Sequence, residues 1–141
     1  MSIQSVLLPL FVEVILTLVL LFWMAGLRNR DFRARAVEPR DIALREPNWP
    51  VRTTQVANCF ANQFELPVLF YVLTILVIIT KHADYLFVIL AWIFVLSRIG
   101  HAAIHTGRNV VTVRGGIWGI GALVLAIMWL IFIVSILLGL P

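Results

Sequence analysis

The stretch GGIWGIGALVLAIMWLIFIVSILLGL, from Gly115 to Leu140, contains no charged residue. About 20 consecutive apolar residues are enough for an α-helix to cross the hydrocarbon core of a bilayer. Segments of this length and composition are too apolar for the surface of a soluble domain. We therefore predict a membrane-spanning helix over residues 115–140.

Three further segments have a similar character. Residues 3–27 are apolar apart from Glu13, residues 52–80 are polar in their first half and apolar in their second, and residues 85–105 are apolar until close to their end. The whole chain is 62% hydrophobic and 13% charged, against about 25% charged residues in an average soluble domain. The sequence predicts an all-α membrane protein, a single domain over residues 1–141 that forms an up-down-up-down bundle of four transmembrane helices.

The basic residues indicate how this bundle is oriented. Six of the ten arginines lie between residues 28 and 45, two more lie in the segment 106–114, and the remaining connection has Lys81 alone. By the positive-inside rule we expect loops 28–51 and 106–114 on the cytoplasmic side and both termini on the opposite side. Because the formal charge of +4 is concentrated in these loops, it indicates orientation and contact with lipid headgroups rather than nucleic-acid binding.

Polar residues gather at the same end of the bundle. At about 100° per residue, one stripe of the second span holds four of them: Gln55, Asn58, Asn62 and Glu65. A stripe near the end of the third span holds three more: Arg98, His101 and His105. Charged side chains at membrane depth are costly toward lipid, so both stripes should face the bundle interior or a neighbouring subunit. We expect Glu65 to be the ionic partner of Arg98.

Some of these residues have a simpler structural explanation. Hydrogen bonds between helices hold membrane bundles together, and this role suffices for Gln55, Asn58 or Glu13 taken singly. A functional site is favoured by a larger set, because it holds more ionisable groups than adhesion of four short helices requires: Glu65, Arg98, His101, His105 and Arg114.

Two other patterns do not indicate a site. His101 and His105 are four residues apart, as in helical zinc motifs, but the segment between them lacks the general-base Glu and Arg98 would repel a cation, so no metal is predicted. A group of glycines resembles a phosphate-binding loop without the Lys-Ser/Thr that such a loop needs, and close helix packing explains it better: Gly115, Gly116, Gly119 and Gly121.

Several motifs together resemble the MAPEG family, the membrane-associated proteins of eicosanoid and glutathione metabolism. Asn62-x-x-Glu65 is followed by Pro67 and an aromatic-rich apolar run. Arg98-x-x-His101 is followed, sixteen residues after Arg98, by Arg114. This spacing is similar to that of the microsomal prostaglandin E synthase and microsomal glutathione transferase branch, which two further motifs also fit: Arg28-x-Arg30 and Pro39-x-Asp41.

The resemblance implies a homotrimer that holds glutathione, as co-substrate, between neighbouring subunits, while a lipophilic substrate enters from the membrane lipid. It implies that Arg114 is the catalytic residue, which stabilises the glutathione thiolate with its positive charge. Arginine forks bind carboxylates well, and the implied glutathione-binding residues are Arg28, Asn62, Glu65, Arg98, His101 and His105.

The chain departs from the family pattern at three places. The second span lacks the Arg that usually precedes the Asn-x-x-Glu motif, His105 stands where Tyr is common, and Gly115 stands where a Ser often follows the catalytic Arg. Three functions therefore stay open. The first is a glutathione-dependent transferase, peroxidase or isomerase for lipophilic electrophiles, the second is a non-catalytic lipid- or partner-binding protein of the same fold, and the third is a small transport or proton-handling protein that uses Glu13 with the two histidines and Glu65.

Overall fold

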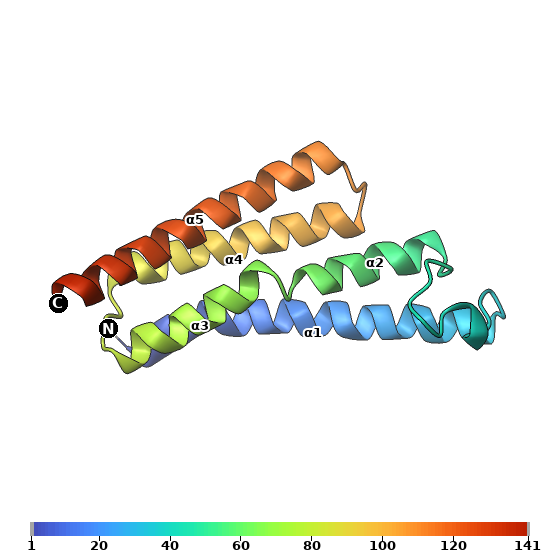
Figure 1. Cartoon of the computed structure of the whole chain (residues 1–141), viewed down its shortest axis with the longest axis horizontal. Helices are drawn as coiled ribbons and strands as arrows, with labels where there is room; N and C mark the ends of the chain where they lie inside the picture. The colour runs from blue at the N-terminus through green and yellow to red at the C-terminus, as the bar shows by residue number, and fades with distance from the viewer. Residues whose placement is uncertain (1, 141) are drawn as a thin grey trace.

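The computed structural model describes residues 2–140. Its helices, in chain order, are α1 (Ile3–Arg33), a 3-10 helix η1 (Pro39–Asp41), α2 (Val51–Asn62), α3 (Leu66–Ile79), α4 (Tyr85–Thr106) and α5 (Val111–Leu138) (Figure 1). Four segments are long and apolar enough to cross a membrane: α1, α2 with α3, α4 and α5. The predicted four-helix membrane bundle is confirmed, and the chain is a multi-pass membrane protein.

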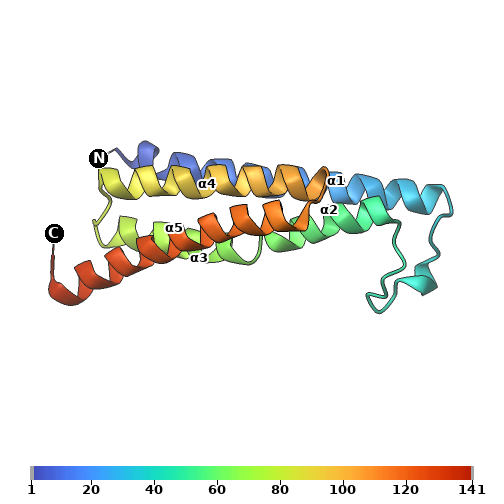
Figure 2. The ribbon, with the colours of Figure 1, turned by 90° about the horizontal axis from the view of Figure 1, so that it is seen from above.

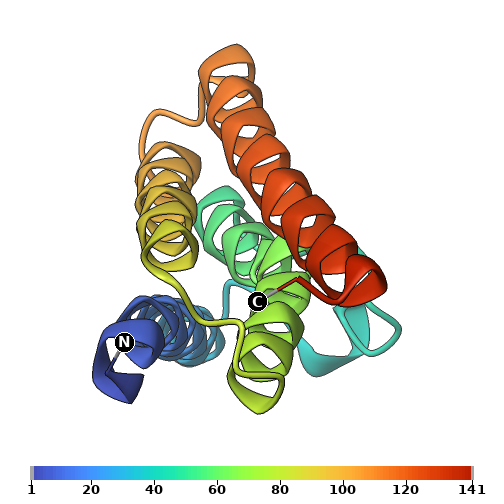
Figure 3. The same cartoon turned by 90° about the vertical axis from the view of Figure 1, so that its left-hand side faces the viewer.

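The helices run up and down along one axis of the molecule. Both chain ends lie at one end of the bundle, together with the connection between α3 and α4 (Figures 1 and 2). The two Arg-bearing connections, from α1 to α2 and from α4 to α5, lie at the other end. Helix α4 packs against α5, α1 and α2, while α3 packs against α1 and α5, as the end-on view shows (Figure 3).

Helix α1 is longer than the sequence predicted, because it continues to Arg33 rather than ending at Leu27. No Gly or Pro interrupts these last turns, and Arg30 and Arg33 lie where the helix dipole favours positive charge. Asp31 anchors this end: it is 3% exposed, accepts a hydrogen bond from Thr53 Oγ1 of α2 and forms an ion pair of 3.0 Å with Arg30. At about 1.5 Å per residue α1 is about 46 Å long, so it extends beyond a hydrocarbon core of about 30 Å.

The second predicted span is two helices instead of one. Pro67 has no N–H to bond the carbonyl of Gln63, and its ring clashes with that carbonyl in a continuous helix. Helix α2 therefore ends at Asn62, and α3 begins at Leu66 with Pro67 in its first turn. The chain crosses the gap in a tight turn, with Glu65 at φ −96° and ψ −105°. The break occurs inside the predicted Asn62–Glu65 motif, so it changes the directions of the side chains on which the site depends.

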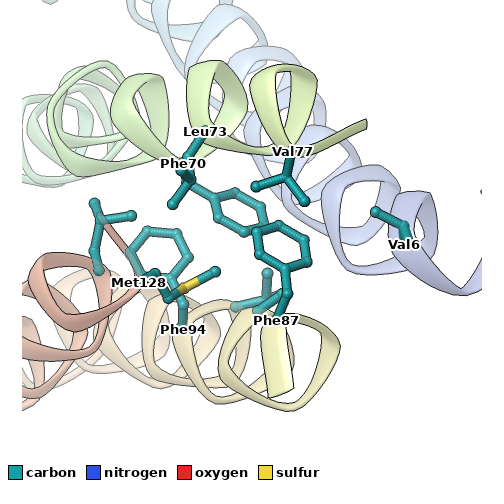
Figure 4. Close-up of a cluster of buried hydrophobic side chains, with 10 residues drawn as sticks. Val6, Phe70, Leu73, Val77, Phe87, Phe94 and Met128 are labelled. Atoms are coloured by element: carbon teal, nitrogen blue, oxygen red, sulfur yellow. The ribbon is translucent and has the colours of Figure 1, made fainter. Parts of the chain in front are cut away.

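Two apolar clusters form the core. The larger one, drawn in Figure 4, joins all four spans through residues that include Val6, Phe70, Phe94 and Met128. The rings of Phe70 and Phe94 lie 4.8 Å apart between centroids. The smaller cluster lies toward the Arg-bearing end and contains Leu20, Cys59 and Ala102. Apolar side chains also cover much of the outer surface. The polar side chains of the spans lie mainly in the interior, between and beside the two clusters.

The glycines of α5 differ in their surroundings. A Cβ added to Gly121 would lie 2.7 Å from Ser97 Oγ on α4, so close helix packing is confirmed there. A Cβ added to Gly115, Gly116 or Gly119 would meet no atom within 4 Å. Within the described part of this chain these three glycines therefore pack against no neighbouring helix, and close helix packing stays a prediction for them.

Candidate functional site

The candidate site is built around Arg98, whose side chain extends from α4 toward the break between α2 and α3. Arg98 is 0% exposed. Its Nη2 donates to the side-chain oxygen of Asn62 and, at 3.4 Å, to the Asn62 backbone carbonyl. Asn62 Nδ2 in turn donates to Glu65 Oε2 at 2.7 Å. A continuous series of contacts thus leads from the buried guanidinium to Glu65, which is exposed.

The direct ion pair between Glu65 and Arg98 that we expected is not formed. Within residues 2–140 the ion pairs join Arg30 to Asp31 and Arg40 to its neighbours in η1. The amide of Asn62 lies between the two charged groups, since it accepts from one and donates to the other. The physical reason is the helix break, which turns Glu65 to the surface while Asn62 still faces α4.

The two histidines continue the same face of α4 toward the Arg-bearing end. His101 is 3% exposed and His105 is 7% exposed, and their rings meet edge to face at 5.5 Å between centroids. His101 Nδ1 lies 3.1 Å from the carbonyl oxygen of Arg114. A carbonyl only accepts hydrogen bonds, so Nδ1 carries a proton and, in a neutral ring, Nε2 is an acceptor. His101 therefore ties the start of α5 to α4.

Arg114 lies in the first turn of α5 and is half-buried. Its Nη1 donates to the side-chain oxygen of Asn109. Asn109 has φ +53°, a left-handed conformation that Asn tolerates better than most residues. The sequence places Asn109 in the connection between two spans, where Asn is typical of a turn, but it did not indicate the contact with Arg114.

Arg28 is separate from this group within the chain. Its guanidinium lies 5.1 Å from the centroid of the Trp49 ring. It lines a surface groove with residues of α2 that include Asn58 and Ala61, and none of the other predicted site residues lines that groove. The structure thus brings together six of the seven predicted site residues and leaves Arg28 on a different surface.

Gln55 and Arg52 have a structural role that supports the simpler interpretation of Gln55. Gln55 Nε2 donates to the carbonyls of His105 and Gly107, at 2.7 and 2.9 Å, and Arg52 donates to the carbonyl of Thr106. The last carbonyls of a helix have no partner within the helix. The side chains of Arg52 and Gln55 bond these carbonyls, so they attach the end of α4, near the histidines, to α2.

The exposed members of the site differ in charge from its buried members. The Glu65 carboxylate is exposed and the Arg114 guanidinium is half-buried, while Arg98 and the histidines are buried. A carboxylate and a guanidinium suit a ligand with both cationic and anionic groups. Among the side chains described, no group of three or more His, Cys, Asp or Glu is arranged to hold a metal ion.

Comparison with known proteins gives one match. The sequence profile of the MAPEG family matches residues 6–134, which include most or all of each of the four spans and every candidate site residue. No curated protein and no solved structure matched the chain. The four-span bundle, the Arg98–Asn62–Glu65 contacts and this match over most of the chain agree with one another, and the chain belongs to the MAPEG family.

Proposed function

We propose that the protein is a membrane-bound, glutathione-dependent transferase, peroxidase or isomerase that acts on lipophilic electrophiles dissolved in the bilayer. Membership of the MAPEG family supports a glutathione-related function in general. The observation that carries the finer proposal is that one face of α4 holds both groups of predicted residues: Arg98 bonds Asn62, which bonds Glu65, and His101 bonds the backbone carbonyl of Arg114.

The proposed glutathione contacts follow from exposure. Glutathione has two carboxylates, an ammonium group and a thiol. Glu65 is exposed and suits the ammonium group, Asn62 is half-buried beside it, and Arg28 is a half-buried guanidinium that suits a carboxylate. Arg98, His101 and His105 are too buried to be the outer contacts. We infer that these three buried residues do not contact the ligand and instead orient Asn62, Glu65 and Arg114.

The proposed chemistry depends on Arg114. A free thiol has a pKa of about 8.5, and a guanidinium beside it favours the thiolate, which is the nucleophile. In conjugation to an aryl halide the thiolate sulfur bonds to the ring carbon and halide leaves with the electron pair, so no redox partner is needed. Asn109 would hold Arg114 in position for this role.

A homotrimer is part of the proposal, with the site completed between neighbouring subunits. Arg28 shares no groove or contact with the Glu65 group in one protomer, so a ligand that uses both would bridge two subunits. The open face of α5 at Gly115, Gly116 and Gly119 supports close approach of another helix, because small residues allow helix backbones to pack closely in membranes.

The experiment begins with glutathione binding to the protein purified in detergent or nanodiscs, followed by conjugation to a small aryl halide. We expect Arg114→Ala to lower the conjugation rate about a hundredfold while it changes glutathione affinity much less. Arg108→Ala is the matched control, since Arg108 is an exposed Arg of the same connection. Glu65→Gln should weaken binding because the carboxylate for the ammonium group is lost.

The result that would overturn the proposal is absence of binding at millimolar glutathione. The non-catalytic member of the same fold, which binds a lipid or a partner protein, would then be the better explanation. If Arg114→Ala and Arg108→Ala conjugate at equal rates, the proposed role of Arg114 is excluded, while the proposal of glutathione binding is unaffected.

A further inference from the structure

A layer of polar side chains separates the two apolar clusters of the core. On α1, Glu13 lies one heptad from Val6 of the larger cluster and one heptad from Leu20 of the smaller one, so all three share a face. On α4, Arg98 lies between the same two clusters. Glu13 and Arg98 are both 0% exposed. Helices α1 and α4 pack against each other, so the layer crosses the middle of the bundle.

Several polar atoms in this layer have no hydrogen-bond partner among the described residues. They are both carboxylate oxygens of Glu13, Oε1 of Gln63, and Nε and Nη1 of Arg98. Gln63 is 1% exposed and adjoins Asn62, which bonds Arg98, so it lies at the same level. A buried charge is strongly unfavourable unless another charge or a hydrogen bond compensates for it. These unpartnered atoms therefore identify the groups that must compensate for one another.

The charges of Glu13 and Arg98 are complementary. Both side chains are fully buried on helices that pack against each other and they form no direct ion pair within residues 2–140, so they compensate for each other across the layer. Nη2 of Arg98 donates to Asn62, so Nε and Nη1, which have no hydrogen-bond partner among the described residues, are the nitrogens left for the Glu13 carboxylate. The contacts then continue from Asn62 to Glu65 at the surface.

We propose that Glu13 is a positioning residue of the site. It is the intramembrane counter-charge that holds Arg98 in place, so that Arg98 orients Asn62 and Asn62 orients the exposed carboxylate of Glu65. The effect on ligand binding rests on the proposed glutathione function, whereas the pairing of Glu13 with Arg98 does not. A guanidinium keeps its proton in proteins, so this series of contacts transmits position rather than protons.

The test uses Cys59, the single cysteine of the chain, as a reporter that does not depend on glutathione. Cys59 is 0% exposed and belongs to the smaller cluster beside Arg98. Four variants are compared with the native protein in nanodiscs: Glu13→Gln, Arg98→Gln, the double variant, and Glu13→Asp. Thr17→Val is the matched control, because Thr17 lies one turn from Glu13 and its hydroxyl donates to the Glu13 backbone carbonyl, at 3.1 Å, and not to the carboxylate.

Each single neutral variant leaves one buried charge without its counter-charge, which draws water into the layer. We expect a membrane-permeant maleimide to label Cys59 about tenfold faster in Glu13→Gln and in Arg98→Gln. The double variant removes both charges and should label at nearly the native rate. Glu13→Asp, which keeps the charge, and Thr17→Val should also label nearly as slowly as the native protein.

Glutathione affinity separates positioning from a purely structural role. We expect the dissociation constant for glutathione to rise about tenfold in Glu13→Gln. It should stay raised in the double variant, although Cys59 is labelled slowly in that variant. Glu13→Asp should recover most of the affinity, and Thr17→Val should keep it.

Two results would overturn the inference. A double variant that labels as fast as the faster single variant would show that the two charges do not compensate for each other. Fast labelling of Glu13→Gln with native glutathione affinity would exclude the positioning role. If the native protein binds no glutathione, the proposed function fails, and a compensated double variant would still establish the Glu13–Arg98 pair.

Discussion

Uncharged polar side chains make most of the contacts that connect the helices at the Arg-bearing end of this protein. Four of them bond either a charged side chain or a carbonyl at the end of a helix: Thr53, Gln55, Asn62 and Asn109. An amide or hydroxyl costs less to bury than an ionised group and can both donate and accept. These residues therefore determine where the charged groups lie, while glycine determines how closely the helices approach.

At the residue scale we predict different effects for two glycines on α5. Gly121→Leu would push against Ser97 on α4 and, through it, against Arg98, since an added Cβ already lies 2.7 Å from Ser97 Oγ and 3.9 Å from Arg98 Cδ. We expect a loss of about 1–3 kcal/mol in the free energy of unfolding, measured by denaturation in detergent micelles.

The matched control is Gly119→Leu, because a Cβ there meets no atom within 4 Å. Monomeric protein should show a change below about 0.5 kcal/mol in this variant. Equal losses for the two variants would contradict the close contact between α5 and α4 at Gly121.

At the scale of elements, the break between α2 and α3 is the feature that forms the site. A continuous helix would direct Asn62 and Glu65 along one stripe. The break allows Asn62 to bond Arg98 of α4 while Glu65 reaches the surface. Membrane helices tolerate such interruptions where side chains and tight turns satisfy the released backbone groups. Here the backbone amides of Gln63 and Phe64 donate to carbonyls of the last turn of α2.

We predict that Pro67→Ala closes this break. Alanine supplies the missing N–H for the Gln63 carbonyl and removes the clash of the ring. The straighter helix would draw Asn62 away from Arg98, so glutathione affinity should fall about tenfold while the helical circular dichroism signal increases.

Pro9→Ala is the control, because α1 is continuous through Pro9. It should leave both glutathione affinity and the circular dichroism signal unchanged. If Pro67→Ala also retained native affinity, the break would not be what orients the site.

At the scale of the whole molecule, the bundle has two ends of different character. One carries both Arg-bearing connections, and the other carries both termini and the connection between α3 and α4, while the break between α2 and α3 lies about midway between them (Figure 1). Because both Arg-bearing connections lie at one end, the positive-inside rule predicts that this end is cytoplasmic.

The orientation is testable by cysteine labelling in a Cys59→Ala background. Tyr85→Cys, at a position 78% exposed at the start of α4, should react with a membrane-impermeant maleimide on intact cells. Ala43→Cys, at an exposed position in the connection after α1, should react only after the membrane is permeabilised. The Cys59→Ala parent should not react, and the reverse labelling pattern would contradict the proposed orientation.

Much of this architecture is a local property of the chain. Apolar length predicts the four spans, the helical period predicts the polar stripes, and the spacing of Arg98, His101 and Arg114 indicates the family. Span ends were harder to predict. The polar composition of residues 28–33 indicated a loop, but the hydrogen bond from Thr53 to Asp31 stabilises these residues as the last turns of α1. The helix break was also missed, although Pro67 is visible in the sequence, since proline can kink a membrane helix without ending it.

The amino-acid sequence by itself determined that this protein spans a membrane four times and that its arginine-rich connections share one end, because hydrophobicity and charge patterning need no knowledge of neighbouring helices. Only the tertiary structure decided that Asn62 rather than Glu65 contacts Arg98, that Arg28 lies on another surface, and that Glu13 lies in the same buried layer as Arg98. The choice of partner depends on distances between side chains on different helices, and those distances exist only once the helices have packed.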